Sequence, residues 1–290
     1  MGCSKLQIFF YFALIHLVIT TAAQSSCDDA VNIYTSNSTY KANLDGLLAS
    51  MINNIKIDYG FYNFSAGESP DKVYAIALCT GDASPSECRS CINESRYELL
   101  QACPNQKEAI HWAWFKKCLI RYSYKSIFHI LETEPKIGTF RVRNATDVEN
   151  FYNALTPLLD SLRNRAATGN STHKFALQSG IASDFQTIYA LLQCTPDLTA
   201  KDCNTCLQSV QAYASKCCGE KQGGIFLAPS CVIRYELYSF YNPSAESPQS
   251  PPPLPLSPPL IAASPPTSTP GMHWCCFMTL SFFFFFFSFF

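Results

Sequence analysis

The chain contains two stretches in which apolar residues recur every three or four positions, at 44–55 and 151–162. This spacing places the apolar side chains on one face of an amphipathic helix. A short apolar segment follows each stretch, at 73–78 and 188–192, and ends next to a cysteine. The pattern therefore predicts that each half of the chain contains a helix followed by a buried strand.

A second helix and two further strands complete each half. We expect the second helix to begin after Ser84 or Ser86 in the first half and after Thr199 in the second, because hydroxyl side chains cap helix N-termini. The aromatic-rich strands that follow are predicted at 110–115, 119–127, 225–227 and 232–241. Helices and antiparallel strands in this order predict an α+β domain of about 100 residues.

The cysteines show that the two halves are copies of one another. Cys79, Cys88, Cys91 and Cys103 recur 115 residues later as Cys194, Cys203, Cys206 and Cys218, and Cys118 recurs 113 residues later as Cys231. The flanking residues repeat as well, since Cys-Leu-Ile-Arg-Tyr in the first copy matches Cys-Val-Ile-Arg-Tyr in the second. The chain is therefore a tandem duplication.

The N-terminus predicts export. Residues 1–23 combine a positive charge at Lys5, an apolar run at 6–19 and the small residues Thr21-Ala22-Ala23, as in a signal peptide. Glycosylation sequons, which agree with export, begin at Asn37, Asn63, Asn93, Asn144 and Asn170. We therefore expect a secreted protein of the extracellular space.

Charge and composition exclude several functions. Lys and Arg number 21 against 22 Asp and Glu, so the chain lacks the positive field that captures nucleic acid. The sequence shows no nucleophile–base pair, paired carboxylates or phosphate-binding glycine loop. We predict that the protein is not an enzyme and needs no cofactor.

The fifteen cysteines predict a disulfide framework, because export places them in an oxidising compartment. A zinc site would need paired knuckles or a repeated histidine, and His111, His129 and His173 hold no repeated position. In the second copy, the counterpart of Cys27 is missing and Cys217 stands directly before Cys218. A bridge between neighbours would be strained, since adjacent Cα atoms lie about 3.8 Å apart. The state of these two thiols stays open, either reduced, bridged to each other or paired between chains.

The double Cys-x8-Cys-x2-Cys motif, with Gln193-Cys-Thr-Pro-Asp-Leu and Cys231-Val-Ile-Arg-Tyr-Glu, resembles the plant ginkbilobin-homologous (stress-antifungal) domain. Two such domains after a signal peptide resemble the ectodomain of cysteine-rich receptor-like kinases, related secreted proteins and plasmodesmata-located proteins. The resemblance implies an α+β fold in which a helical pair packs on a five-stranded antiparallel sheet in each domain. It implies the bridges Cys27–Cys103, Cys79–Cys88, Cys91–Cys118, Cys194–Cys203 and Cys206–Cys231. The domains would span 27–130 and 147–242, with a linker at 131–146.

The single-domain founder of this family binds mannose through an Asn, an Arg and a Glu at fixed distances from its cysteines. In the first copy these positions hold Asp28, Trp112 and Ser123, and in the second copy two of them hold Ile225 and Glu236. Only Glu236 is retained and Asp28 is a partial substitute, so we expect most of this sugar-binding triad to be lost.

The segment from His111 to Phe115 is an aromatic cluster that could stack on a sugar. Its alternation indicates instead a strand with one face buried, and we expect it to pack in the core.

The C-terminus changes in character at residue 243. Residues 243–270 are rich in Pro and Ser and predict an extended linker, and residues 271–290 are almost wholly apolar. Three interpretations remain open: a glycolipid-anchor signal cleaved at Ser264, a membrane segment, or translated non-coding sequence that replaces the rest of a longer receptor.

Taken with the resemblance, these features predict an extracellular recognition module in plant stress or defence signalling. Its partner would be a carbohydrate or another cell-surface ectodomain, with contact to the plasma membrane only through a C-terminal anchor. The alternatives are a secreted antifungal lectin and a truncated receptor-kinase ectodomain.

Overall fold

The computed structural model describes residues 24–27, 32–53, 59–113, 115, 117–182 and 186–242. The predicted signal peptide, Asp28, Ser264 and both C-terminal segments lie outside these residues. No helix within them is long and apolar enough to cross a membrane. The elements are β1 (Gln24–Cys27), α2 (Thr39–Asn53), β2 (Phe61–Ala66), β3 (Val73–Cys79), α3 (Pro85–Ala102), β4 (Ala109–Ala113), β5 (Cys118–Ser123), β6 (Ile137–Phe140), α4 (Val148–Ala167), β7 (Phe175–Ile181), β8 (Thr187–Cys194), α5 (Ala200–Cys218), β9 (Gly224–Ala228) and β10 (Cys231–Glu236).

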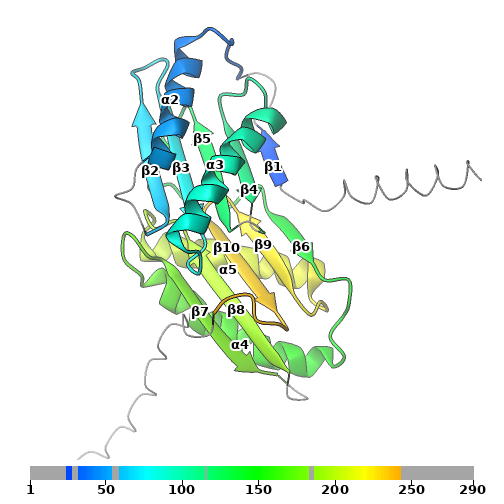
Figure 1. The fold of residues 1–290 in the computed structure, drawn as a ribbon. Coiled ribbons are helices and arrows are strands. Elements are labelled where there is room, and N and C mark those ends of the chain that lie inside the picture. Colours follow the sequence, from blue (N-terminus) through cyan, green and yellow to red (C-terminus); the bar gives the residue numbers. More distant parts are fainter. Residues whose placement is uncertain are drawn as a thin grey trace, which may run out of the picture. The chain divides into compact units, whose positions relative to one another are not determined.

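Each repeat folds as a five-stranded antiparallel sheet with two helices on one face. The strand orders are β1-β4-β5-β3-β2 and β6-β9-β10-β8-β7, so the same topology occurs twice. Figure 1 shows α2 and α3 in front of the first sheet and α5 behind the second. The expected α+β fold with a helical pair on each sheet is confirmed.

The second helix of each repeat begins at a capped turn. Of the two candidates in the first repeat, Ser84 is the cap, and its hydroxyl accepts the Glu87 N–H while the Glu87 carboxylate accepts the Ser84 N–H. Thr199 caps α5 by accepting the Asp202 N–H at 3.1 Å. These bonds satisfy N–H groups that a helix start leaves unpaired.

The helix-free faces of the two sheets pack against each other. One apolar cluster joins Trp112, Leu78 and Leu119 of the first sheet to Leu191 and Val232 of the second. All five residues of β4 are buried, so the prediction that only one face of this strand is buried was wrong. The reason is that one face of the strand meets α3 and the other meets the second repeat, which no pattern within a single repeat reveals.

Side-chain hydrogen bonds also link the repeats. The Gln193 amide donates to the Cys79 carbonyl at 2.8 Å, and its oxygen accepts the Gly81 N–H at 3.1 Å. Asp197 accepts the His129 N–H at 2.8 Å. Because Gln193 is buried, losing these bonds would leave backbone polar groups without partners.

The structure contains all five bridges that the resemblance implied, Cys27–Cys103, Cys79–Cys88, Cys91–Cys118, Cys194–Cys203 and Cys206–Cys231. It also joins Cys217 to Cys218 at the end of α5. The strand register explains why the second repeat has one bridge fewer between its elements. Phe140 occupies the position that Cys27 has in the first repeat, opposite Gly224, and Cys218 occupies the position of Cys103.

Candidate functional site

Most positions of the family's mannose triad are unavailable to a ligand. Trp112 is 1% exposed and Ile225 is 3% exposed, and both lie in the cluster between the two sheets. Ser123 is fully buried, and its hydroxyl accepts the Lys125 N–H. Asp28 lies outside the described residues. Glu236 alone remains as a candidate within them.

Glu236 is the last residue of β10, and its carboxylate forms a bidentate ion pair with Arg141. The Arg141 Nε and Nη2 atoms each donate to one carboxylate oxygen at 2.9 Å. The Tyr238 hydroxyl donates to the same carboxylate at 3.1 Å, and Arg141 also donates to Tyr238. Hydrogen bonding to Glu236 raises the pKa of the Arg141 guanidinium above its ordinary value, so this group stays charged.

Sequence reasoning missed Arg141, because it lies 95 residues from Glu236 and is absent from the family's triad. It directly follows edge strand β6, and its N–H donates to the Gly223 carbonyl at 2.9 Å. A side chain at Gly223 would collide with the Glu236 carboxylate and the Tyr235 carbonyl. A glycine at this position therefore makes room for the ion pair.

Two cavities flank the Arg141–Glu236 pair. The larger measures about 340 Å³ and is lined by Arg141, Val142, Arg143, Gln222, Glu236, Leu237 and Tyr238. The smaller measures about 60 Å³ and includes Phe115, Phe140 and Ile225. Tyr238 and Phe140 are 46% and 48% exposed, so aromatic surface is available beside a buried carboxylate. We call the larger cavity the Arg141–Glu236 cavity.

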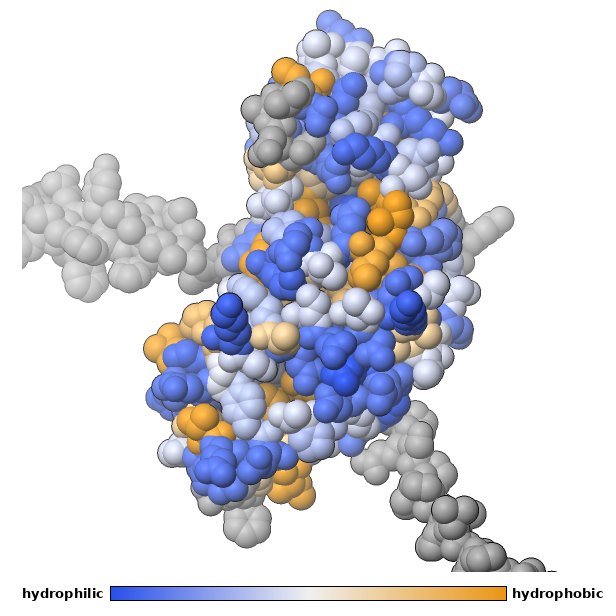
Figure 2. All heavy atoms as spheres, turned by 180° about the vertical axis from the view of Figure 1, so that it is seen from behind, coloured by the Kyte–Doolittle hydropathy of each residue, from blue (hydrophilic) through white to orange (hydrophobic). Residues whose placement is uncertain are grey.

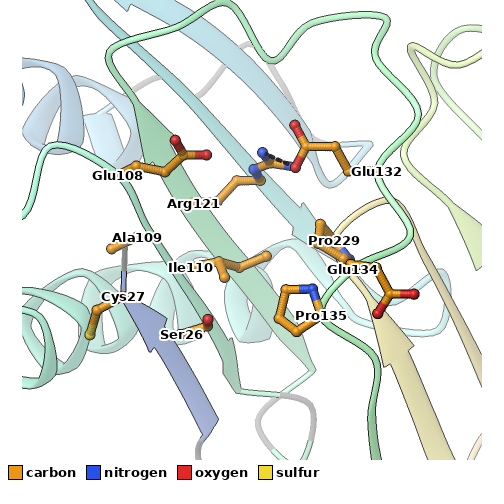
Figure 3. Close-up of a pocket in the computed structure, with 10 residues that line it drawn as sticks. All are labelled: Ser26, Cys27, Glu108, Ala109, Ile110, Arg121, Glu132, Glu134, Pro135 and Pro229. Carbon is orange, nitrogen blue, oxygen red and sulfur yellow. Dashed lines mark hydrogen bonds and ion pairs between the residues drawn. The ribbon is translucent and has the colours of Figure 1, made fainter. Parts of the chain in front are cut away.

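The first repeat has a cavity of about 180 Å³ at the place on its sheet that corresponds to the smaller of these two cavities, since Ile110 in the first repeat matches Ile225 in the second. Figure 3 shows Glu108, Arg121 and Glu132 on one side of it, with Ser26 and Pro135 opposite. The buried Arg121 donates to Glu132 at 2.7 Å. We call it the linker cavity, because Glu132 and Pro135 belong to the segment between the repeats.

His111 makes a hydrogen-bonded chain with Ser25 and Glu98 that superficially resembles a catalytic triad. Its Nδ1 lies 2.7 Å from the Ser25 hydroxyl, and its Nε2 lies 3.0 Å from the Glu98 carboxylate. The ring is 2% exposed and lines neither cavity, so we interpret it as a structural link between β1, β4 and α3. Across the residues that the structure describes, no three His, Cys, Asp or Glu side chains come together as a metal site.

The glycosylation sequons lie mainly on exposed surface. Asn37, Asn63, Asn144 and Asn170 are exposed, whereas Asn93 on α3 is half-buried. Asn144 is next to Arg143, and its amide donates to Glu220 at 3.1 Å. A glycan there would be close to the Arg141–Glu236 cavity.

Two repeats of one disulfide-bridged domain, packed through their sheets, define a tandem ectodomain-type module. The family model described as salt stress response/antifungal matches residues 26–125 and 139–238. The chain belongs to this family.

Relatives and solved structures agree with this membership. Cysteine-rich receptor-like protein kinase 25 of Arabidopsis thaliana is 37% identical over 264 residues, which cover 87% of this chain and 38% of the kinase. Cysteine-rich repeat secretory protein 38 of Arabidopsis thaliana is 34% identical, with 81% of this chain and 94% of that protein covered. The chain thus spans little more than a third of the length of the receptor kinases that it matches.

The crystal structure of the tandem DUF26 ectodomain of the Arabidopsis thaliana cysteine-rich receptor-like protein PDLP8 matches with a TM-score of 0.62 and 21% identity. The match covers 73% of this chain and 96% of that one. The corresponding PDLP5 ectodomain matches with a TM-score of 0.59 and 23% identity over 73% of this chain and 97% of that one. These structures share the fold of this chain.

Proposed function

We propose that this chain is a non-enzymatic extracellular recognition module that binds a carbohydrate in the Arg141–Glu236 cavity. The observation that carries the proposal is a buried carboxylate and a half-exposed guanidinium fixed to one another at 2.9 Å beside an open cavity. The family description and the receptor-like and secretory relatives support a role in plant stress or defence at the cell surface or in the apoplast.

The chemistry of the cavity suits a sugar. Each sugar hydroxyl both donates and accepts, so it can pair with a carboxylate oxygen and a guanidinium N–H at once. The exposed ring of Tyr238 at the cavity and that of Phe140 beside it offer apolar faces for the C–H side of a pyranose. The ion pair holds both polar groups in place before the ligand arrives, which lowers the entropy lost on binding.

A glycan array probed with the secreted protein tests this function. We expect binding to a defined set of glycans, with at least about tenfold weaker binding for Glu236→Gln, since a lost charged hydrogen bond costs about 1.5–3 kcal/mol. Tyr238→Ala serves as a second variant, because it removes the exposed ring and its hydroxyl bond to Glu236 while both Arg141 bonds to the carboxylate remain. Glu68→Gln in the exposed β2–β3 turn is the matched control. A well-folded wild-type protein that binds no glycan would overturn the proposal.

A second candidate function, capture of a partner ectodomain, is favoured by the exposed apolar residues beside edge strand β6. Val142 is 91% exposed and Phe115 is 61% exposed, close to Phe140. Figure 2 shows that apolar surface on the face opposite Figure 1 forms separate spots among polar side chains. Phe140→Glu would abolish such a protein contact, measured by surface plasmon resonance against the ectodomain of a receptor-like relative.

A further inference from the structure

We infer that the ligand of the Arg141–Glu236 cavity carries a carboxylate, and that it is an acidic oligosaccharide containing uronic acid units whose carboxylate pairs with Arg143. This inference rests on the proposed function and narrows it to one class of sugar. It follows from the balance of charges around the cavity and from the aromatic surface beside the cations.

One cation that lines the Arg141–Glu236 cavity has no carboxylate partner among the described residues. Arg143 is exposed there and makes no side-chain bond to any of them. Lys221, which lies beside the cavity, donates to the Val142 carbonyl at 3.2 Å and to the Asn144 amide oxygen at 2.8 Å, both of which are neutral. Since Arg141 and Arg143 line the cavity with Glu236 as its one acid, the cavity has an excess of positive charge.

The remaining charges do not cancel this excess. Glu236 is bonded to Arg141 through both oxygens, and Arg234 approaches the same carboxylate at 3.7 Å. The single Glu236 carboxylate therefore faces two guanidinium groups, those of Arg141 and Arg234, and Arg143 adds a third. A neutral sugar would need none of these additional cations, whereas an acidic sugar would gain a charge-assisted bond from them.

The shape of the cavity fits a short segment of an oligosaccharide. A volume of about 340 Å³ is at the small end of the usual range for ligand sites, and it suits one or two sugar rings. The guanidinium of Arg143 presents a planar fork that can bind both oxygens of a carboxylate, which a lysine cannot do. The Arg141 guanidinium lies 5.0 Å from the centre of the Tyr238 ring, so a planar cation and an aromatic face border the same space.

Calorimetric titration with matched oligosaccharides tests the inference. The probes are a trimer of galacturonic acid and its carboxyl-reduced form, a galactose trimer that differs only in lacking the charges. We expect the acidic trimer to bind at least tenfold tighter, and we expect added salt to reduce this difference. Arg143→Gln should remove most of the difference, while Lys201→Gln on the exposed start of α5 should leave it unchanged. Each titration is repeated after enzymatic removal of N-glycans, because of the sequon at Asn144.

The outcomes separate this inference from the proposed function. Equal affinity for the two trimers, or binding only of neutral glycans that depends on Glu236, would overturn the carboxylate inference and leave the lectin function standing. A failure to bind any glycan would overturn both. Equally tight binding of a polyglutamate peptide of the same charge would show unspecific attraction, and would also overturn the inference.

Discussion

Restoring the missing bridge of the second repeat should stabilise the protein. Phe140 has the place of Cys27 in the register, since Phe140 lies opposite Gly224 of β9 as Cys27 lies opposite Ala109 of β4. Cys218, 3% exposed, has the place of Cys103. Phe140→Cys should therefore form a bridge to Cys218 without rearrangement of the sheet.

The expected gain follows from the length of the loop that the bridge closes. Positions 140 and 218 are 78 residues apart, close to the separation of 76 between Cys27 and Cys103. In the chain-entropy model such a loop corresponds to about 4.5 kcal/mol, and engineered bridges commonly reach less than this. We therefore expect about 2–4 kcal/mol, or a rise in Tm of about 5–15 °C for a domain pair of this size.

The comparison requires a background in which Cys218 has no neighbouring thiol. The parent is Cys217→Ser, the test protein adds Phe140→Cys, and the control adds Phe140→Ser. Peptide mapping without reduction identifies the bridge, and thermal unfolding followed by circular dichroism gives Tm. Absence of the bridge would refute the positional equivalence, and a bridge that leaves Tm unchanged would refute the entropy argument.

Three further predictions concern the fold. Gln193→Leu should lower the free energy of unfolding by about 1–3 kcal/mol in a urea titration, because the Cys79 carbonyl and the Gly81 N–H lose their partner. The control is the exposed substitution Gln208→Leu, and an equally small change for both variants would contradict the role of Gln193. Trp112→Ala should cost about 3–5 kcal/mol by the same assay, since the ring is 1% exposed between the sheets, and a loss below about 1 kcal/mol would argue against the packing of the repeats. The pKa of Glu87 is lowered by the Ser84 N–H, and the pKa of Asp147 is lowered by the Asn150 N–H. Each carboxylate therefore stabilises the fold fully above its ordinary pKa, which is 4.5 for Glu87 and 3.8 for Asp147. This stabilisation is lost as the pH falls through the lowered pKa of the folded state. Urea midpoints between about pH 3 and 6 should therefore fall less steeply for Glu87→Gln with Asp147→Asn than for the wild type, and parallel curves would contradict the assignment.

The cysteine spacing and the apolar pattern predict much of the fold within each repeat. The strands that end at a cysteine, β3 and β8, stand out because most of their residues are apolar. The edge strands do not: β1 is Gln-Ser-Ser-Cys, and β6 has only four residues with a glycine among them. Edge strands need few apolar side chains, since neighbouring strands supply their pairing, and a pattern of burial cannot detect them.

The candidate site was predictable only in part, for a related reason. Glu236 could be identified from its distance to Cys231, which is a property of one segment of chain. Arg141 and Arg143 reach the same cavity from the segment after β6, and only the strand register brings them there. The burial of Trp112 and Ile225 likewise depends on contact between repeats. Long-range pairing thus decides which inherited positions can still meet a ligand.

Hydrogen–deuterium exchange of the purified protein with and without the galacturonic acid trimer tests the location of the site most directly. The account predicts slower exchange in peptides that cover 137–145 and 231–238, and unchanged exchange in peptides that cover 105–113 and 130–136 at the linker cavity. Protection at the linker cavity, or no local protection despite measurable binding, would contradict the assignment of the Arg141–Glu236 cavity as the recognition site.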